Sequence, residues 1–256
     1  MLDPTQRFSS RVENYVKYRP SYPPAIIDLL TTKCGLTPDS IIADIGSGTG
    51  LLTELFLKNG NRAYGIEPNR EMREAGEHLL KGYARFTGIA AAAEATTLAD
   101  HSVDFVTAGQ AFHWFDRDRA RIEFERILRA RGWVILIWND RRTTATPFQQ
   151  AYEQLVHTYA TDDIAIEHQQ VDADVLRSFY GSPAFRLKTF DNQRMVDDFE
   201  SLKGGLLSAS YTPEAGQPNH LPMLEELCRI FEAHQIDGRV SFEYDTQVYY
   251  GRLVTA

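Results

Sequence analysis

Hydrophobic positions between residues 41 and 138 alternate between short runs rich in β-branched residues and longer amphipathic stretches. Such short runs are typical of buried strands, and such stretches are typical of helices that pack on a sheet. Helices are predicted after residue 50, at 69–80 with Asn69 as the N-cap, and at 117–129. The predicted strands are 41–45, 62–67, 84–89, 103–108 and 133–138. This regular alternation indicates a parallel sheet with helices on both faces.

The pattern changes after residue 139. Amphipathic stretches predict helices at 147–159 and 221–234, and alternating residues predict strands at 185–190 and 240–250, the last one antiparallel to its neighbour. Residues 204–222 are rich in Gly, Ser and Pro, which predicts a loop or cap over a site. The residues at core spacing in the second helix are Leu224, Leu227, Cys228 and Phe231.

We therefore expect a single α/β domain with a Rossmann-like, doubly wound and mostly parallel sheet, helices on both faces and an antiparallel C-terminal strand. A chain of 256 residues fits one large domain. Residues 1–40 would form a lead-in or cap, and 41–140 the ligand-binding core. Residues 141–256 would form a C-terminal part with a substrate cap around 200–222.

The amino-acid composition limits the classes of partner and the compartment that the protein is expected to have. The 35 acidic and 27 basic side chains give a net charge of −8, which disfavours a nucleic-acid backbone as a partner. No apolar run approaches the roughly 18 residues of a membrane span, and none follows the N-terminal charges as in a secretory signal. The two cysteines, Cys34 and Cys228, suit a reducing compartment. Composition predicts a cytoplasmic protein with a small-molecule partner and leaves the oligomeric state open.

The first predicted strand ends in a glycine-rich loop. Ligands of open parallel sheets bind outside the carboxyl ends of the strands, and glycines let the backbone turn sharply and approach a ligand. Candidate contacts in this loop are Asp44, Gly46, Ser47, Gly48 and Gly50. Glu67, followed by Pro68, ends the second strand, where a carboxylate can accept hydrogen bonds from two ribose hydroxyls.

Several ligands could use this geometry. A dinucleotide fingerprint needs glycine where Leu51 stands, and the loop lacks the Gly-Lys-Ser/Thr ending of a P-loop. The Gly-x-Gly-x-Gly spacing after an acidic strand end, with Glu67 downstream, resembles the S-adenosylmethionine (SAM) site of class I methyltransferases. Alternatively, the glycines only make a tight strand–helix turn and Glu67 is solvated.

The resemblance extends to both sides of the loop. Residues 8–11 and 15–23 resemble the lead-in of the methyltransferase-type-11 branch, which includes trans-aconitate methyltransferase-like proteins. In that branch the lead-in folds over the donor, which implies that Tyr18 or Arg19 lies near the methionine carboxylate. A surface salt bridge is the alternative for Arg19.

Residues 93–98 resemble the adenine-side loop of the same branch. Many relatives carry an acidic residue where this chain has Ala92. The resemblance therefore implies adenine contacts from the backbone of Ala93 or from Glu94. Gln110, after the fourth strand, is a further candidate donor contact.

Candidate acceptor residues follow the fourth and fifth strands. Trp114 would give the pocket an apolar wall and His113 a polar group, acting either as a general base or as an orienting residue. Arg141 or Arg142 could hold a carboxylate, and Tyr211, in the predicted cap, could touch the substrate. Each of these residues also has a purely structural alternative. Cysteines and histidines are scattered, so no metal site is predicted.

We therefore predict SAM-dependent methyl transfer to a small-molecule acceptor, with a small organic acid as one acceptor class. Because the sulfonium makes the donor methyl reactive, catalysis can rest on positioning and on the exclusion of water. Two alternatives remain: a SAM-binding module without transferase activity, and a nicotinamide-dependent oxidoreductase, which Leu51 disfavours.

Overall fold

The computed structural model describes residues 18–161, 172–181, 185–209 and 211–254. Its strands form one seven-stranded sheet in the order β3-β2-β1-β4-β5-β7-β6. The first five strands are mutually parallel: β1 (Ile41–Ile45), β2 (Arg62–Ile66), β3 (Phe86–Ile89), β4 (Val103–Gly109) and β5 (Leu128–Arg141). β7 (Val240–Gly251) runs antiparallel between β5 and β6 (Phe185–Val196). The predicted fold class is confirmed.

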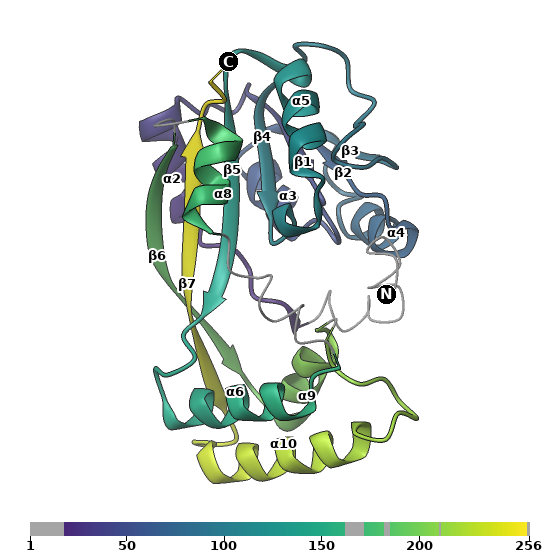
Figure 1. Cartoon of the computed structure of the whole chain (residues 1–256), viewed down its shortest axis with the longest axis vertical. Helices are drawn as coiled ribbons and strands as arrows, with labels where there is room; N and C mark the ends of the chain where they lie inside the picture. The colour runs from purple at the N-terminus through teal and green to yellow at the C-terminus, as the bar shows by residue number, and fades with distance from the viewer. Residues whose placement is uncertain (1–17, 162–171, 182–184, 210, 255–256) are drawn as a thin grey trace.

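Helices cover both faces of the sheet (Figure 1). Buried residues of α2 (Ala25–Cys34) and α3 (Leu51–Lys58) pack with one face. Those of α5 (Arg117–Ile127) and α8 (Ala173–Tyr180) pack with the other. The N-cap of α4 (Arg70–Leu79) is Asn69, as predicted, because its side-chain oxygen accepts a hydrogen bond from the backbone N–H of Met72 at 2.9 Å.

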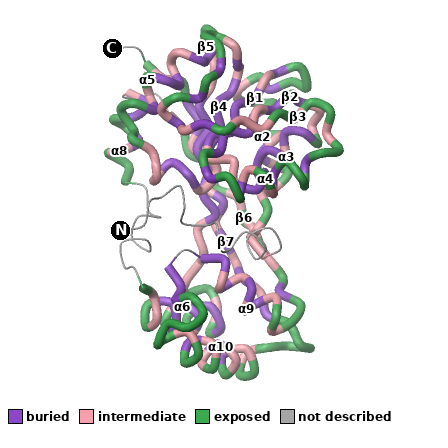
Figure 2. Tube along the Cα trace, turned by 90° about the vertical axis from the view of Figure 1, so that its right-hand side faces the viewer, coloured by how far each residue is buried: buried purple, intermediate pink, exposed green. Residues whose placement is uncertain are grey.

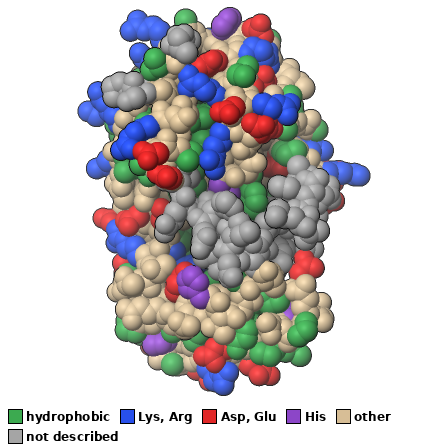
Figure 3. Space-filling view, in the orientation of Figure 1, with side chains coloured by type: hydrophobic (Ala, Val, Ile, Leu, Met, Phe, Trp, Pro, Cys, Tyr) green, Lys and Arg blue, Asp and Glu red, His purple; other side chains and the backbone are tan. Residues whose placement is uncertain are grey.

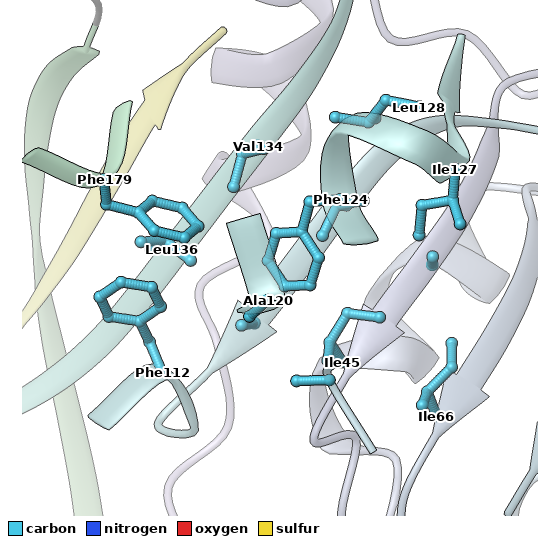
Figure 4. Packing of buried hydrophobic residues seen from close by; sticks show 14 of the residues in the cluster. Ile45, Ile66, Phe112, Ala120, Phe124, Ile127, Leu128, Val134, Leu136 and Phe179 are labelled. Atoms are coloured by element: carbon cyan, nitrogen blue, oxygen red, sulfur yellow. The ribbon is translucent and has the colours of Figure 1, made fainter. Parts of the chain in front are cut away.

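The core beneath α5 is rich in aromatic residues (Figure 4). Phe112 begins the short 3-10 helix Phe112–Trp114, which is separated from the end of β4 by two residues, and the centroid of the Phe112 ring lies 4.6 Å from that of Phe179, edge to face. Phe179 in turn packs edge to face with Phe124 of α5 at 6.0 Å. Buried aromatic rings contribute large apolar areas, so Phe112 fixes the chain where β4 ends.

A second group of elements lies beyond the carboxyl end of β5. α6 (Pro147–Tyr159), α9 (Phe199–Leu207) and α10 (His220–His234) enclose a separate hydrophobic cluster with the adjacent ends of β6 and β7. We call this group the lower module. Figures 1 and 2 show β6 and β7 running from the core into it, so the two parts are joined by continuous strands.

The predicted loop over residues 204–222 is wrong at both ends, since α9 includes Gly204 and α10 begins at His220. Glycine has a low helix propensity, but tertiary contacts override it here. Asp198 caps α9 by accepting a hydrogen bond from the backbone N–H of Ser201 at 2.7 Å. A Cβ at Gly204 would collide with the ring of Tyr18, so the glycine permits a close approach to the helix.

Other predicted boundaries also change. β6 continues to Val196, six residues beyond the predicted end, because every residue of this strand pairs with β7. The buried face of α10 is formed by Met223, Leu227 and Ile230, so only Leu227 of the predicted stripe is fully buried. The helices α2, α8 and α9 were not predicted.

In the described ranges, no helix combines the length and apolar content that a membrane crossing requires. The lead-in motif at 8–11, and residues 15–17 of the second lead-in motif, lie outside the described residues. Figure 3 shows Lys and Arg side chains lying among Asp and Glu side chains over the upper part of one face.

Candidate functional site

Two adjoining cavities open near the carboxyl ends of the parallel strands. The smaller, of about 160 Å³, is lined by residues that follow β1, β2, β3 and β4. The larger, of about 680 Å³, lies between the end of β5, residues 18–20 and the lower module. Gln110 lines both cavities, so they meet at the turn that follows β4. The backbone of Gln110 has φ +56°, a conformation that non-glycine residues seldom adopt and that is frequent at functional sites.

Glu67 lies at the base of the smaller cavity and is only 8% exposed. Its carboxylate accepts hydrogen bonds from the backbone N–H groups of Gly48 at 2.9 Å and Asn69 at 2.8 Å. Burial raises the pKa of Glu67, and these two N–H groups oppose that shift. A carboxylate has about four acceptor sites, so two remain for further donors such as ribose hydroxyls.

Most of the residues predicted to contact the methyl donor line this smaller cavity. Gly46, Gly48, Glu67, Pro68, Ala93, Glu94 and Gln110 all do so. Met72 and Phe115, which sequence reasoning missed, add apolar surface. The Glu94 carboxylate also accepts a hydrogen bond from the backbone N–H of Asp116 at 2.8 Å. Trp114, predicted as an acceptor wall, lines the smaller cavity rather than the larger.

Two other predicted loop contacts shape the turn instead of lining either cavity. The carbonyl of Ser47 accepts a hydrogen bond from the backbone N–H of Gly50 at 2.9 Å. Gly50 is the N-cap of α3 with φ +87°, and a Cβ there would lie 2.5 Å from the side chain of Leu80. Only glycine fits this position without displacing Leu80.

We expect Gly48→Val to weaken SAM binding more than tenfold. Gly48 has φ +56°, which strains a β-branched residue, and its N–H would move away from Glu67 as the loop adjusted. Gly35→Val is the matched control, because Gly35 has φ +74° with open space around it. Calorimetry and thermal unfolding of both variants would test this. Normal donor binding by Gly48→Val would mean that the loop is only a turn.

Asp44, also predicted as a donor contact, is a buried link between elements. Its side chain is 1% exposed and accepts hydrogen bonds from the hydroxyls of Thr53 at 2.6 Å and Thr107 at 2.9 Å. It therefore joins β1 to α3 and β4 and lines neither cavity. Burial raises the pKa of Asp44 to about 6.

A raised carboxyl pKa makes folding less favourable as pH rises. The unfavourable charge of Asp44 develops between about pH 4 and pH 6, and the loss of stability is complete above pH 6. We expect the free energy of unfolding of Asp44→Asn, relative to wild type, to rise by up to about 3 kcal/mol between pH 4 and pH 7. Urea unfolding across this range measures it, with exposed Asp39→Asn as the control. Parallel profiles for wild type and Asp44→Asn would contradict the assignment.

Arg141 ends β5 and lines the larger cavity. Its Nη2 donates to the carboxylate of Glu153 at 2.7 Å, and its guanidinium lies 4.9 Å from the ring centroid of Tyr152 and 6.0 Å from that of Phe242. Its Nε is buried and has no hydrogen-bond partner among the described residues. Arg141 is therefore held by an acid and two aromatic rings, with donor capacity remaining for a ligand.

Two more arginines line the same cavity. Arg19 donates from Nη2 to the carbonyl of Ser208 at 3.2 Å. Within the described part of the chain, no ion pair or hydrogen bond joins the guanidinium of Arg194 to another residue, although its backbone pairs with Phe242 of β7. Burial raises the pKa of Tyr244, while Arg141, Arg194 and Arg19 each lower it, so all three guanidinium groups act on this phenol. The three cations converge from distant parts of the chain.

Among the described residues that line the larger cavity, the acidic ones are Asp140 and Glu153. Burial and the neighbouring Asp245 raise the pKa of Asp140 to about 6. Tyr211, predicted as a substrate contact, lines the cavity and is 7% exposed. Sequence reasoning missed Arg194, Tyr152 and Tyr244. The alternation of Phe242 and Tyr244 along the predicted last strand indicated that both rings lie on one face of the sheet. In the structure Tyr244 pairs directly with Arg141 on β5, which brings this face to the larger cavity.

Tyr18 and Arg19 line the larger cavity and not the smaller one. Their contact with the methionine part of SAM stays a prediction. Because Gln110 lines both cavities, ligands bound in the two cavities would meet beside this residue.

His113 lies beside the site rather than in it. Its ring is 4.7 Å from that of Trp114, and it is not among the residues that line either cavity.

We expect His113→Ala to change the single-turnover rate of methyl transfer less than tenfold and to keep the shape of its pH profile. His157→Ala, which alters a residue of the larger cavity, is the comparison. Loss of a rate increase near pH 6.5 in His113→Ala alone would identify His113 as a general base.

Comparison with known proteins agrees with this geometry. Residues 43–136 match the methyltransferase-11 family, described as a methyltransferase domain. An uncharacterized methyltransferase of Schizosaccharomyces pombe is 25% identical over 245 residues, covering 94% of this chain and 95% of that protein. An uncharacterized methyltransferase of Mycobacterium tuberculosis is 36% identical over 139 residues, which is 54% of each chain.

Solved structures share the fold. A putative type II methyltransferase from Anaeromyxobacter dehalogenans aligns with a TM-score of 0.67 at 18% identity, over 93% of this chain and 100% of that one. A geranyl diphosphate methyltransferase in complex with SAM aligns with a TM-score of 0.50 at 15% identity, over 90% and 85%. The domain match and the methyltransferase relatives, together with the shared fold, support a class I SAM-dependent methyltransferase.

Within this class, residues 43–136 are a methyltransferase domain of the methyltransferase-11 type, and SAM is the cofactor of the class. The type-11 resemblance of the sequence is confirmed. The chain is therefore not the nicotinamide-dependent oxidoreductase that the glycine loop alone left open.

Proposed function

We propose that the protein methylates a small organic acid that binds in the larger cavity while SAM binds in the smaller one. The convergence of Arg19, Arg141 and Arg194 in the larger cavity carries the proposal. The chain as a whole has a net charge of −8, so this basic cluster is a local feature that favours anions.

The smaller cavity suits a nucleoside. The carboxylate of Glu67 retains acceptor sites for ribose hydroxyls, and Met72, Ala93 and Phe115 give apolar surface for a base. Bound there, SAM would supply a methyl group activated by its sulfonium. Gln110, at the boundary of the cavities, would lie where donor and acceptor meet.

The residues of the larger cavity would orient the acceptor. Arg141 and Arg194 can each donate two hydrogen bonds to a carboxylate, and Tyr152 and Phe242 hold Arg141 in place. A carboxylate is already ionised near neutral pH, so its methylation needs no general base. Orientation and exclusion of water are then the main contributions of the protein.

Transfer of labelled methyl from SAM to a panel of acids tests the proposal. The panel would contain trans-aconitate, citrate and monocarboxylates, together with their neutral amides. We expect label in a base-labile methyl ester of an acid and none in the amides. Label confined to neutral or amine acceptors would contradict the acid proposal. Tight SAM binding without transfer to any metabolite would favour a binding module.

A further inference from the structure

Residues 18–22, which we call the 18–22 segment, contact both parts of the molecule. At one end, the Tyr18 ring packs against Gly204 of α9, in the lower module. At the other end, the hydroxyl of Tyr22 occupies the space that a Cβ at Gly109 would need at the end of β4. Tyr18, Arg19 and Pro20 line the larger cavity, so this segment forms one of its walls.

The middle of the segment is held by two amides of the sheet. The carbonyl of Ser21 accepts hydrogen bonds from the side chains of Asn192 at 3.0 Å and Asn139 at 3.4 Å. The side-chain oxygen of Asn139 accepts from the hydroxyl of Thr246 at 2.5 Å and from the amide of Asn192 at 3.4 Å. Three neighbouring strands, β5, β6 and β7, thus contribute to one polar network.

The same network reaches the boundary between the cavities. The side-chain amide of Gln110 donates to the backbone carbonyl of Asn139 at 3.2 Å. Asn139 therefore contacts the 18–22 segment through its side chain and the residue shared by both cavities through its backbone. Asn139 also lines the larger cavity itself, whereas Asn192 does not.

Packing alone does not explain these amides. Asn139 is 7% exposed and follows the buried Ile135 and Ile137 at alternate positions of β5. An apolar residue would extend this stripe without the cost of burying an amide, which is offset only when its hydrogen bonds are made. Among the described residues, the hydrogen bonds that Asn139 makes outside the sheet are those to the 18–22 segment and to Gln110.

We propose that Asn139 and Asn192 are positioning residues that fix the 18–22 segment as a wall of the larger cavity and so determine the affinity for the acceptor without altering that for SAM. The meaning of this wall as an acceptor contact rests on the proposed function. The anchoring itself does not, and it can be measured separately.

Asn139→Asp and Asn192→Asp test the anchoring in the full chain. Each keeps the side-chain size but replaces the amide that donates to Ser21 with a carboxylate that repels its carbonyl. We expect chymotrypsin to cleave the Tyr18–Arg19 bond about fivefold to tenfold faster in either variant, because a hydrogen bond is lost and a repulsion is added. Gln193→Glu is the control, since it adds the same charge at an exposed neighbouring position of β6.

Binding and kinetics distinguish positioning from general destabilisation. In both Asp variants we expect the dissociation constant of S-adenosylhomocysteine to stay within twofold of wild type. In Asn192→Asp, whose side chain does not line the larger cavity, the KM for the probe trans-aconitate should rise at least fivefold. Cleavage at the wild-type rate would overturn the proposal. So would a loss of S-adenosylhomocysteine affinity that parallels the cleavage rate. If trans-aconitate is not a substrate of the wild type, that acceptor is excluded, while the cleavage and nucleoside measurements still decide the anchoring.

Discussion

Glu67→Gln is expected to bind SAM about 100-fold more weakly than wild type while remaining folded. The Glu67 carboxylate accepts two backbone N–H groups, from Gly48 and Asn69, and has sites left for ribose hydroxyls. Glutamine keeps the size but has one acceptor oxygen, so its NH₂ group must face a donor. Losing one or two charge-assisted hydrogen bonds of about 1.5–3 kcal/mol each corresponds to this change in affinity.

Calorimetric titration with S-adenosylhomocysteine measures the effect of Glu67→Gln directly. Glu74→Gln is the matched control, because Glu74 is an exposed carboxylate on α4 that pairs with Arg70. Thermal unfolding of both variants would separate a binding defect from a folding defect. Unchanged affinity in folded Glu67→Gln would mean that the carboxylate does not contact the ribose.

Arg141→Met is expected to lower kcat/KM for an acidic acceptor about 100-fold and to leave SAM affinity unchanged. Methionine fills much of the space between Tyr152 and Phe242 but cannot pair with a carboxylate. The substitution also leaves Glu153 in the cavity without its cation, which adds repulsion toward an acid. Steady-state transfer of labelled methyl measures kcat/KM, and calorimetry measures SAM binding.

Two further variants make the Arg141 experiment specific. Arg142→Met removes the next arginine, whose guanidinium pairs with Asp191 and Asp245 across the strands and does not line the larger cavity. Arg142→Met should keep the wild-type kcat/KM. Adding Glu153→Gln to Arg141→Met should recover part of the activity by removing the unpaired charge. If the two arginine variants behave alike, Arg141 is not the anion anchor.

The donor side of the site follows from local sequence. The glycine loop, the acid that ends β2 and the N-cap Asn69 are each encoded within a few residues, so their places in the fold were predictable. Ser47 and Asp44 belong to the same motif and were predicted as ligand contacts, but neither lines a cavity. The side chain of Asp44 instead joins β1 to α3 and β4 through hydrogen bonds from Thr53 and Thr107, and these tertiary contacts cannot be read from the local sequence.

The acceptor side depends on strand register. Arg141 was a candidate because it ends a predicted strand, but Arg194 lies in the part of β6 that the sequence pattern did not predict. Its proximity to Arg141 requires β7 to lie between β5 and β6 in the observed pairing. Gly204 was predicted to lie in a loop but belongs to α9. The glycine at this position makes room for the ring of Tyr18, which is distant in sequence.

The two cavities are lined by residues from different parts of the sequence, and this separation has an evolutionary consequence. All residues that line the smaller cavity lie between Gly46 and Phe115, within the 43–136 segment that matches the family. Apart from residues 18–20 and Gln110, those lining the larger cavity come from residues 139–244. If SAM and the acceptor bind as proposed, substitutions within residues 139–244 can therefore change the acceptor while the residues that hold SAM are inherited unchanged. New specificities can arise in this architecture without an intermediate that has lost its methyl donor.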